Sequence, residues 1–456
     1  MAFILLMILI ILEIGFIAYE LTKAPLKKEW SLKRCIADVA ELIAFIIMLI
    51  FPDIDLSFRF KGLIIILIIR IVISGLFALK NIKNEKTKKK YGIILSGMGS
   101  ILLFAFFITP AFIFTDYNGR ELTGEYEVAE KKAILVDKSR VEEFENDGSF
   151  REVPIYLYYP VNYDGNDNTL PLVIFSHGAF GYYQSNASTY LELASHGYVV
   201  ASIEHPYHAL FTHDSTGKLI MADSHFFDSA YTIGGSEDEG GLSEEELFEV
   251  TSKWMDLREK DMNFVIDTLK DASKNGCSDA WCFTADSKED IEDTVSLIDD
   301  TKIGLMGHSL GGATAVTVGR RDDVSAAIDL DGTMLGEETG VKDGQCVIND
   351  ELYTTPLLSI DSVLHHNDRL KSGQMGLIYA NDVILDNATD GYNTYFNDTA
   401  HMNFTDLPLF SPFLAKNLGM GSVDPGECID QVNKLCLEFF DTYLKGQGQF
   451  SVNECY

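Results

Sequence analysis

The chain has 456 residues and a formal net charge of −32. This length allows about two or three domains, and the negative charge disfavours nucleic acid as a partner, because phosphates would be repelled. The charge is uneven: residues 1–115 carry 14 Lys/Arg and 8 Asp/Glu, a net of +6, which leaves −38 for the remainder. The sequence therefore predicts a basic, apolar front and an acidic rear.

Four apolar stretches occupy the front, at residues 2–19, 35–51, 63–79 and 91–114. Each has about the 17–25 residues that a helix needs to cross a bilayer. We therefore expect a region of four transmembrane helices over residues 1–115 and a linker over 116–123. The first and third connecting loops are rich in lysine and arginine, so the positive-inside rule places them in the cytoplasm. This predicts a multi-pass protein of the cell membrane whose remaining chain is extracytoplasmic.

Three charged residues, Glu13, Glu41 and Arg70, fall inside the apolar stretches. Charged groups at membrane depth usually face the interior of a helix bundle and pair there. We expect Arg70 to pair with Glu41 or Glu13. A structural role in holding the helices together is favoured over a role in transport or sensing.

Six cysteines lie in the predicted outer region, an even number. They are Cys277, Cys282, Cys346, Cys428, Cys436 and Cys455. An oxidising compartment would allow up to three disulfides, including a small loop closed by Cys277 and Cys282. The spacings typical of zinc sites are missing from the sequence, and we expect neither a metal nor an organic cofactor.

Residues 124–456 alternate between predicted strands and helices. The expected strands cover residues 128–136, 153–159, 170–175, 198–203, 303–306, 324–330 and 356–360. Helices are expected over 188–195, from 243 to about 271 with one possible break, and after residue 309. This alternation indicates an α/β domain with a mostly parallel sheet and helices on both faces. Residues 204–241 are irregular and acidic, and favour a surface insertion slightly over a roof for the active site.

The pentapeptide Gly307-His308-Ser309-Leu310-Gly311 follows an apolar run and precedes a helical run of small residues. This is the strand–turn–helix setting of a nucleophile elbow, in which flanking glycines permit a very tight turn. We therefore predict Ser309 as a nucleophile in an α/β-hydrolase fold. The alternative interpretation is an ordinary glycine-rich turn.

A serine nucleophile needs a histidine base and a carboxylate that orients this histidine, and the α/β-hydrolase order is serine, acid, histidine. His365 and His366 come early for the base, so we predict His401. Asp331 and Asp361 each follow a predicted strand, and Asp329 lies just before Asp331. Chain order alone leaves these three acids open.

The oxyanion of the tetrahedral intermediate needs backbone N–H donors. We predict the N–H of Leu310 as one donor, because it follows the nucleophile. The second comes from the loop after the strand at 170–175, where Gly178 and Ala179 are the candidates. His177 and His308 are interpreted as orienting or packing residues.

Several segments together resemble the platelet-activating factor acetylhydrolase family. They are residues 175–181, 198–205, 307–313 and 401–406, over a resemblance that spans about 124–444. The resemblance implies Ser309 as nucleophile, His401 as base, Asp331 as acid in preference to Asp361, and Ala179 as second oxyanion donor. Two departures, at Pro206-Tyr207 and Gly332-Thr333, put the identity of the substrate in doubt.

The function expected from these observations is a membrane-tethered, extracytoplasmic serine ester hydrolase that works through an acyl-enzyme. The substrate would be a short acyl ester of a phospholipid or another amphiphile, and no protein partner is required. A polyester or cutin-type esterase, or a peptidase, is an alternative of the same fold. A membrane sensor or transporter with a non-catalytic outer domain is an alternative of another class.

Overall fold

The computed structural model of the protein describes residues 1–165, 168–235 and 242–456. The chain divides into two compact units. The first, here the helical unit, comprises residues 1–118 together with 409–414, and the second, the α/β unit, comprises 119–408 and 415–456.

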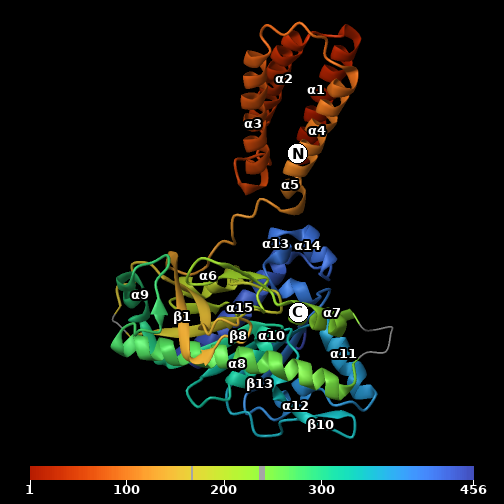
Figure 1. The fold of residues 1–456 in the computed structure, drawn as a ribbon. Helices are drawn as coiled ribbons and strands as arrows, with labels where there is room; N and C mark the ends of the chain where they lie inside the picture. The colour runs from red at the N-terminus through yellow and green to blue at the C-terminus, as the bar shows by residue number, and fades with distance from the viewer. Residues whose placement is uncertain (166–167, 236–241) are drawn as a thin grey trace. The chain divides into compact units, whose positions relative to one another are not determined.

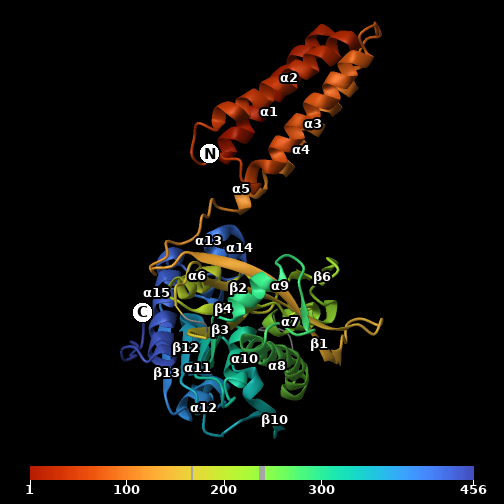
Figure 2. The same cartoon turned by 90° about the vertical axis from the view of Figure 1, so that its left-hand side faces the viewer.

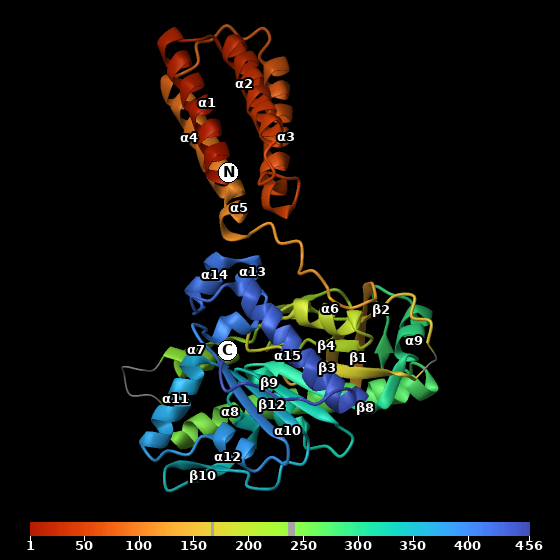
Figure 3. The same ribbon diagram turned by 180° about the vertical axis from the view of Figure 1, so that it is seen from behind.

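The helical unit contains four long helices and one short one. They are α1 (Ala2–Lys23), α2 (Lys27–Met48), α3 (Phe58–Lys80), α4 (Lys90–Ile108) and α5 (Pro110–Ile113). Helix α1 lies beside α4, and α2 lies beside α3 (Figures 1 and 3). Leu9, Phe45 and Leu67 are buried between the helices, whereas Ile65 and Leu95 are exposed on the outside. An apolar exterior of this kind suits contact with lipid.

The prediction of four apolar spans is wrong. Within the described residues, three helices are long and apolar enough to cross a membrane, namely α1, α3 and α4. Helix α2 begins eight residues before the predicted stretch at Cys35 and so includes the charged segment from Lys27 to Arg34. With Asp38 and Glu41 in its middle, it has no sufficiently long apolar window.

The predicted pairing of Arg70 is confirmed. Its guanidinium lies 2.9 Å from the Glu41 carboxylate and 3.6 Å from that of Glu13. Asp38 and Arg34, which were not predicted to belong to this cluster, are also part of it. Asp38 lies 2.8 Å from Arg70 and 2.6 Å from Arg34. The helices are therefore joined by a network of ion pairs rather than by a single pair.

A nine-stranded sheet forms the centre of the α/β unit, in the order β13-β12-β9-β8-β3-β4-β2-β1-β7. The strands are β1 (Val128–Val141), β2 (Phe150–Pro160), β3 (Leu170–Ser176), β4 (Val199–Ile203), β7 (Trp281–Cys282), β8 (Ile298–His308), β9 (Ala326–Leu330), β12 (Leu357–Ser362) and β13 (Gly391–Phe396). All pairs from β13 to β4 are parallel, and β1 pairs antiparallel with β2 and β7. This confirms the predicted mostly parallel sheet of an α/β-hydrolase-like fold.

Helices cover both faces of this sheet (Figure 2). One apolar core packs α8 (Glu244–Asn275) and α9 (Lys288–Val295) against the sheet, and another packs α6 (Ala187–Ser195) and α15 (Pro425–Lys445) against the opposite face. The elbow helix α10 (Leu310–Val318) follows β8. Further helices are α11 (Val363–Gln374), α12 (Ala380–Asp386), α13 (Leu407–Phe410) and α14 (Pro412–Asn417), and the last two include residues of the helical unit. Because β3 and β4 are fully buried, their unbroken apolar sequences are explained.

Residues 204–241 are more regular than expected. They contain a small hairpin, β5 (Phe211–His213) with β6 (Leu219–Met221), and the helix α7 (Ser224–Gly235). A second hairpin joins β10 (Glu338–Lys342) and β11 (Gln345–Ile348). Residues 236–241 of the predicted loop lie outside the described residues. Helix α8 begins with a capping box of Ser243 and Glu246 and runs for 32 residues, without the break that was considered possible.

The prediction of disulfides is wrong for this structure, in which all seven cysteines are free. Cys428 and Cys436 lie on the same helix, α15, eight residues apart and both buried. Their separation of about 12 Å along the helix axis exceeds what a disulfide can bridge. Cys346 lies beside Glu244, and Cys455 lies beside Asn397, so each of these thiols faces a polar side chain.

Candidate active site

The nucleophile elbow lies between β8 and α10. Ser309 has φ 57° and ψ −126°, a left-handed conformation that a residue with a side chain rarely adopts. A Cβ on Gly307 would come within 2.2 Å of the Gly311 backbone, and one on Gly311 within 1.8 Å of the Ser176 carbonyl oxygen. The two glycines therefore have a steric reason to flank Ser309, and the turn places this serine at the end of a central strand.

Asp331 and His401 lie in direct contact. Asp331 follows β9, and its Oδ2 lies 2.8 Å from His401 Nδ1. The backbone N–H of Ser362 donates a hydrogen bond to the other carboxylate oxygen. Burial alone would raise the pKa of Asp331, but contacts with His365 and His401 outweigh burial and hold the pKa well below its usual range. Asp331 is therefore a carboxylate that can fix the orientation of His401.

His401 also lies close to the elbow. Its backbone carbonyl accepts a hydrogen bond from His308 Nε2 at 3.1 Å, and the two imidazole rings are 4.5 Å apart. The His401 side chain is 45% exposed, whereas Asp331 behind it is buried. The pKa of His308 is lowered to about 3, first by burial and then by the neighbouring His401, so His308 is neutral at pH 7. The predicted base is thus the accessible member of the cluster.

The other two candidate acids are engaged elsewhere. Asp361 is fully buried, is bonded to the Arg369 guanidinium and accepts a hydrogen bond from Asn393 at 3.0 Å. Asp329 accepts from the Gly332 N–H, and burial together with the charge of Asp361 raises its pKa well above the usual value. Of the three acids that the residues left open, Asp331 is the one that contacts His401.

The loop after β3 passes directly against the elbow. A Cβ on Gly178 would lie 2.9 Å from His308 Nδ1 and 3.1 Å from Ser309 Cβ. Ala179 packs in an apolar cluster that also contains Leu310 and Trp254. Both predicted oxyanion donors, at Ala179 and Leu310, therefore lie beside Ser309.

A buried arginine holds this loop from behind. Arg258, on α8, is fully buried and donates hydrogen bonds to the backbone carbonyls of His177 and Gly178. Because C=O and N–H point in opposite directions across a trans peptide, a fixed Gly178 carbonyl also fixes the direction of the Ala179 N–H. Sequence reasoning missed Arg258, although it and Asp261 stand out as charges within the apolar stripe of a helix.

A second serine–histidine–aspartate array lies next to Arg258. Ser176 Oγ is 2.9 Å from His205 Nε2, and His205 Nδ1 is 3.0 Å from Asp261 Oδ2. All three side chains are fully buried, and burial lowers the pKa of His205 to about 4. Since substrate has no access to Ser176, this array is part of the support for the loop rather than a second site.

His365 is a further member of the cluster that the sequence reading set aside. Its Nδ1 lies 3.4 Å from Asp331 and 3.5 Å from Asp361, and its Nε2 lies 3.0 Å from the Tyr379 hydroxyl. The ligand atoms of Asp331, Asp361 and His365 lie within 4.8 Å of one another, a separation that could hold a cation. A metal there would compete with His401 and Arg369 for the same carboxylates, so this cluster fits an ion-pair network better than a metal site.

The sequence of this chain is similar to that of a known protein family. A family model described as “Platelet-activating factor acetylhydrolase, isoform II” matches residues 152–455. The platelet-activating factor acetylhydrolases of dog (Canis lupus familiaris) and cattle (Bos taurus) are each 26% identical to this chain over 293 residues. These matches cover 60% and 61% of this chain and 57% and 58% of the relatives, so less than two thirds of each relative is spanned. A ferulic acid esterase structure from Streptomyces cinnamoneus aligns with a TM-score of 0.49 and 20% identity, over 72% of this chain and 93% of that one.

Proposed function

Because the chain belongs to the platelet-activating factor acetylhydrolase isoform II family, we propose that it is a serine ester hydrolase with its active site at Ser309. The single observation that carries the proposal is the 2.8 Å contact of Asp331 with His401, whose backbone carbonyl binds His308, the residue before the strained Ser309. This matches the chain order and roles of an α/β-hydrolase triad.

The proposed reaction has two halves. Ser309 Oγ attacks the ester carbonyl while His401 Nε2, the ring nitrogen that does not face Asp331, takes the serine proton. The C–O bond to the alcohol then breaks, and His401 returns the proton to the leaving alcohol. In the second half, water gives its proton to His401 and attacks the acyl-enzyme, and the proton then passes back to Ser309 as the carboxylic acid leaves.

The oxyanion formed in both halves would accept hydrogen bonds from the N–H groups of Leu310 and Ala179. Each such donor, fixed before the reaction, lowers the barrier by about 3 kcal/mol. Arg258 supports the Ala179 donor by holding the Gly178 carbonyl at 3.2 Å. We assign Arg258 as a positioning residue, since it acts through the backbone and not on the substrate.

The proposal extends to the placement of the enzyme. We place residues 1–115 in the cell membrane, residues 116–123 as a linker and residues 124–456 as an extracytoplasmic catalytic domain. Three apolar helices support the place in the membrane. The basic first and third loops support the extracytoplasmic side of the catalytic domain, a side that requires α2 to cross the membrane together with α1, α3 and α4. A short acyl ester of a phospholipid or another amphiphile is the proposed substrate, since the relatives are named platelet-activating factor acetylhydrolases and an acetyl group is a short acyl chain.

Turnover of p-nitrophenyl esters of increasing chain length tests the proposal on the full chain. The wild type should hydrolyse the short esters, and Ser309→Ala should lose activity by a factor on the order of 10⁶. Ser325→Ala, in the loop before β9, is a matched control that should retain it. Equal turnover by Ser309→Ala and the wild type would overturn the assignment.

A further inference from the structure

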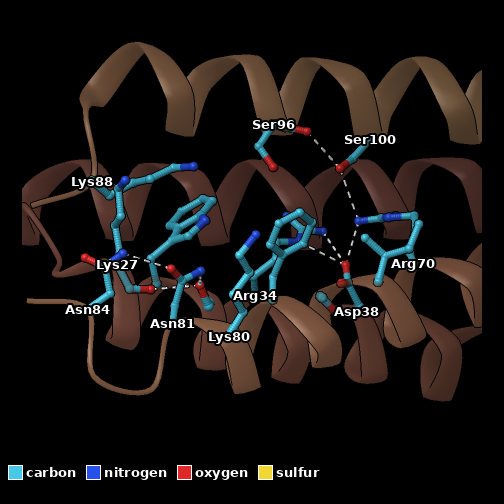
Figure 4. A pocket seen from close by; sticks show the side chains of 15 residues that line it. Lys27, Arg34, Asp38, Arg70, Lys80, Asn81, Asn84, Lys88, Ser96 and Ser100 are labelled. Atoms are coloured by element: carbon cyan, nitrogen blue, oxygen red, sulfur yellow. Dashed lines mark hydrogen bonds and ion pairs between the residues drawn. The ribbon is translucent and has the colours of Figure 1, made fainter. Parts of the chain in front are cut away.

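A cavity of about 590 Å³ lies within the helical unit. Its walls come from α2, α3, α4 and the segment that joins α3 to α4. Along α2 the polar lining runs from Lys27 to Asp38, about 16 Å at 1.5 Å per residue. Lys27 and Lys88 lie at one end, and Asp38 and Arg70 lie at the other (Figure 4). The cavity is therefore lined mostly by polar residues, although the exterior of the bundle is apolar.

The deep end of the cavity is closed by internal ion pairs. Arg34 lies 2.7 Å from Glu13 and 2.6 Å from Asp38, and Arg70 lies 2.8 Å from Asp38 and 2.9 Å from Glu41. Three carboxylates therefore surround two guanidinium groups. This end has no positive charge to spare for an anionic ligand.

The opposite end carries three lysines, Lys27, Lys80 and Lys88. Residues 1–118 are all described, and within them none of the three lysines forms an ion pair with a carboxylate, whereas the neighbouring Lys28 pairs with Glu85 at 2.8 Å. The Lys88 ammonium lies 5.4 Å from the centre of the Trp30 ring. Burial, and then the charge of Lys27, lower the pKa of Lys88, as expected for cations gathered without a counter-charge.

Membrane topology alone does not explain this gathering. A positive-inside loop needs only exposed cations, such as Lys89 and Lys90 of the same segment. Lys27 and Lys88 are instead half-buried against the cavity, together with the amides of Asn81 and Asn84. The two amides already donate hydrogen bonds, from Asn84 to Asn81 and from Asn81 to Ser31, each at 3.0 Å. The lysine ammonium groups beside the Trp30 ring are therefore the groups that suit a phosphate carried by an amphiphile.

We propose that this cavity binds a phosphate-bearing anion, either the headgroup of an anionic phospholipid or a soluble phosphate ester, with Lys27, Lys80 and Lys88 as its cationic ligands. The carboxylates of the deep end keep the phosphate at the lysine end and leave the depth of the cavity to hydroxyl groups of the headgroup. This site is separate from the hydrolase chemistry and does not rest on it.

Native mass spectrometry of the full-length protein in neutral detergent tests the site, with phosphatidylglycerol and phosphatidylcholine of identical acyl chains as probes. The wild type should bind one phosphatidylglycerol in clear preference to phosphatidylcholine. Each lysine contributes about fivefold in affinity, so Lys27→Gln/Lys80→Gln/Lys88→Gln should bind phosphatidylglycerol roughly a hundredfold more weakly. Competition by millimolar sn-glycerol 3-phosphate would assign the site to soluble phosphate esters as well, and failure to compete would assign it to lipid.

Two variants guard against a trivial result. Lys90→Gln removes an exposed cation of the same segment and should bind as the wild type does. Lys80→Gln changes an exposed side chain at the mouth of the cavity and should bind phosphatidylglycerol about fivefold more weakly. This single variant keeps the proposal testable if the triple variant fails to fold. Equal binding of the two lipids, or wild-type affinity in the triple variant and in Lys80→Gln, would overturn the proposal.

Discussion

Both units of the molecule bury a network of charges, and the two networks end differently. In the α/β unit the chain of contacts from Asp361 and His365 through Asp331 ends at His401, whose side chain is 45% exposed. In the helical unit the buried carboxylates pair with Arg34 and Arg70, and the three lysines that line the mouth of the cavity have no carboxylate partner among the described residues. We expect each unit to interact with a ligand or substrate at these accessible groups. His401 would transfer a proton in the α/β unit, and the lysines would bind an anion in the helical unit.

Among substitutions in the two charge networks, the largest effect should come from the acid that contacts His401. Asp331→Asn keeps the shape of the side chain but favours the wrong tautomer of His401, so kcat should fall by a factor on the order of 10⁴. Asp361→Asn is the matched control: it weakens a buried contact with Arg369, and should lower stability by about 1–3 kcal/mol with far less effect on kcat. Steady-state kinetics and thermal unfolding of both variants measure this contrast, and a larger kcat loss in Asp361→Asn would reverse the assignment.

The helical network should respond in stability rather than in chemistry. Arg70→Leu leaves Asp38 and Glu41 with one buried cation fewer, and should destabilise the helical unit by about 3–5 kcal/mol. Detergent-solubilised protein would show this as a lower unfolding temperature and lower accumulation. Lys61→Leu, at an exposed position of the same helix, is the control. An Arg70→Leu protein as stable as the wild type would show that the ion pairs do not hold the helices together.

Arg258→Met tests whether the oxyanion loop is positioned from behind. The variant removes hydrogen bonds to the carbonyls of His177 and Gly178, so the Ala179 N–H should lose its direction and kcat should fall by a factor on the order of 10². KM should change little, because substrate does not contact Arg258. Arg321→Met, which removes a half-exposed ion pair of the same unit, should leave kcat unchanged. Active-site titration with a phosphonate separates slower chemistry from loss of folded enzyme, and an unchanged kcat per titrated site would contradict the positioning role.

The smallest effect concerns His365 and pH. Burial lowers the pKa of His365, but the carboxylates of Asp331 and Asp361 outweigh it and raise the pKa above the usual value. The charged imidazole therefore stabilises the fold at pH values below about 6.5, and this contribution is lost as the pH rises through the raised pKa. The difference in unfolding temperature between wild type and His365→Gln should be larger at pH 6 than at pH 9. A difference that is constant or grows with pH would contradict this reading.

Local signals in the sequence were enough for the centre of the fold, because central strands such as β3 and β4 are buried on both faces and have mostly apolar sequences. The elbow is local too, since Gly307 and Gly311 are needed by a turn of five residues. Asp331 was preferred through the family resemblance, because chain order does not distinguish it from Asp361. Its contact with His401 joins residues 70 positions apart, which no local pattern encodes.

Other features depended on tertiary contacts that the sequence does not display. Helix α2 begins at Lys27 and includes Arg34, because its charged residues form ion pairs with α1 and α3. The length of the apolar run had predicted a start at residue 35, which is wrong. The cysteines matched a disulfide pattern by number, but the fold places Cys428 and Cys436 on one helix. Arg258 reaches backbone carbonyls about 80 residues away in the chain, and only the packed structure brings them together.

The most direct test of the central claim is the site of covalent labelling by a serine-directed fluorophosphonate on the full-length protein. Peptide mapping should find one label per chain, on Ser309, and His401→Ala should abolish labelling because Ser309 then lacks the base that takes its proton. Labelling of a different residue, or undiminished labelling of Ser309→Ala, would contradict the assignment of Ser309 as the nucleophile of this protein.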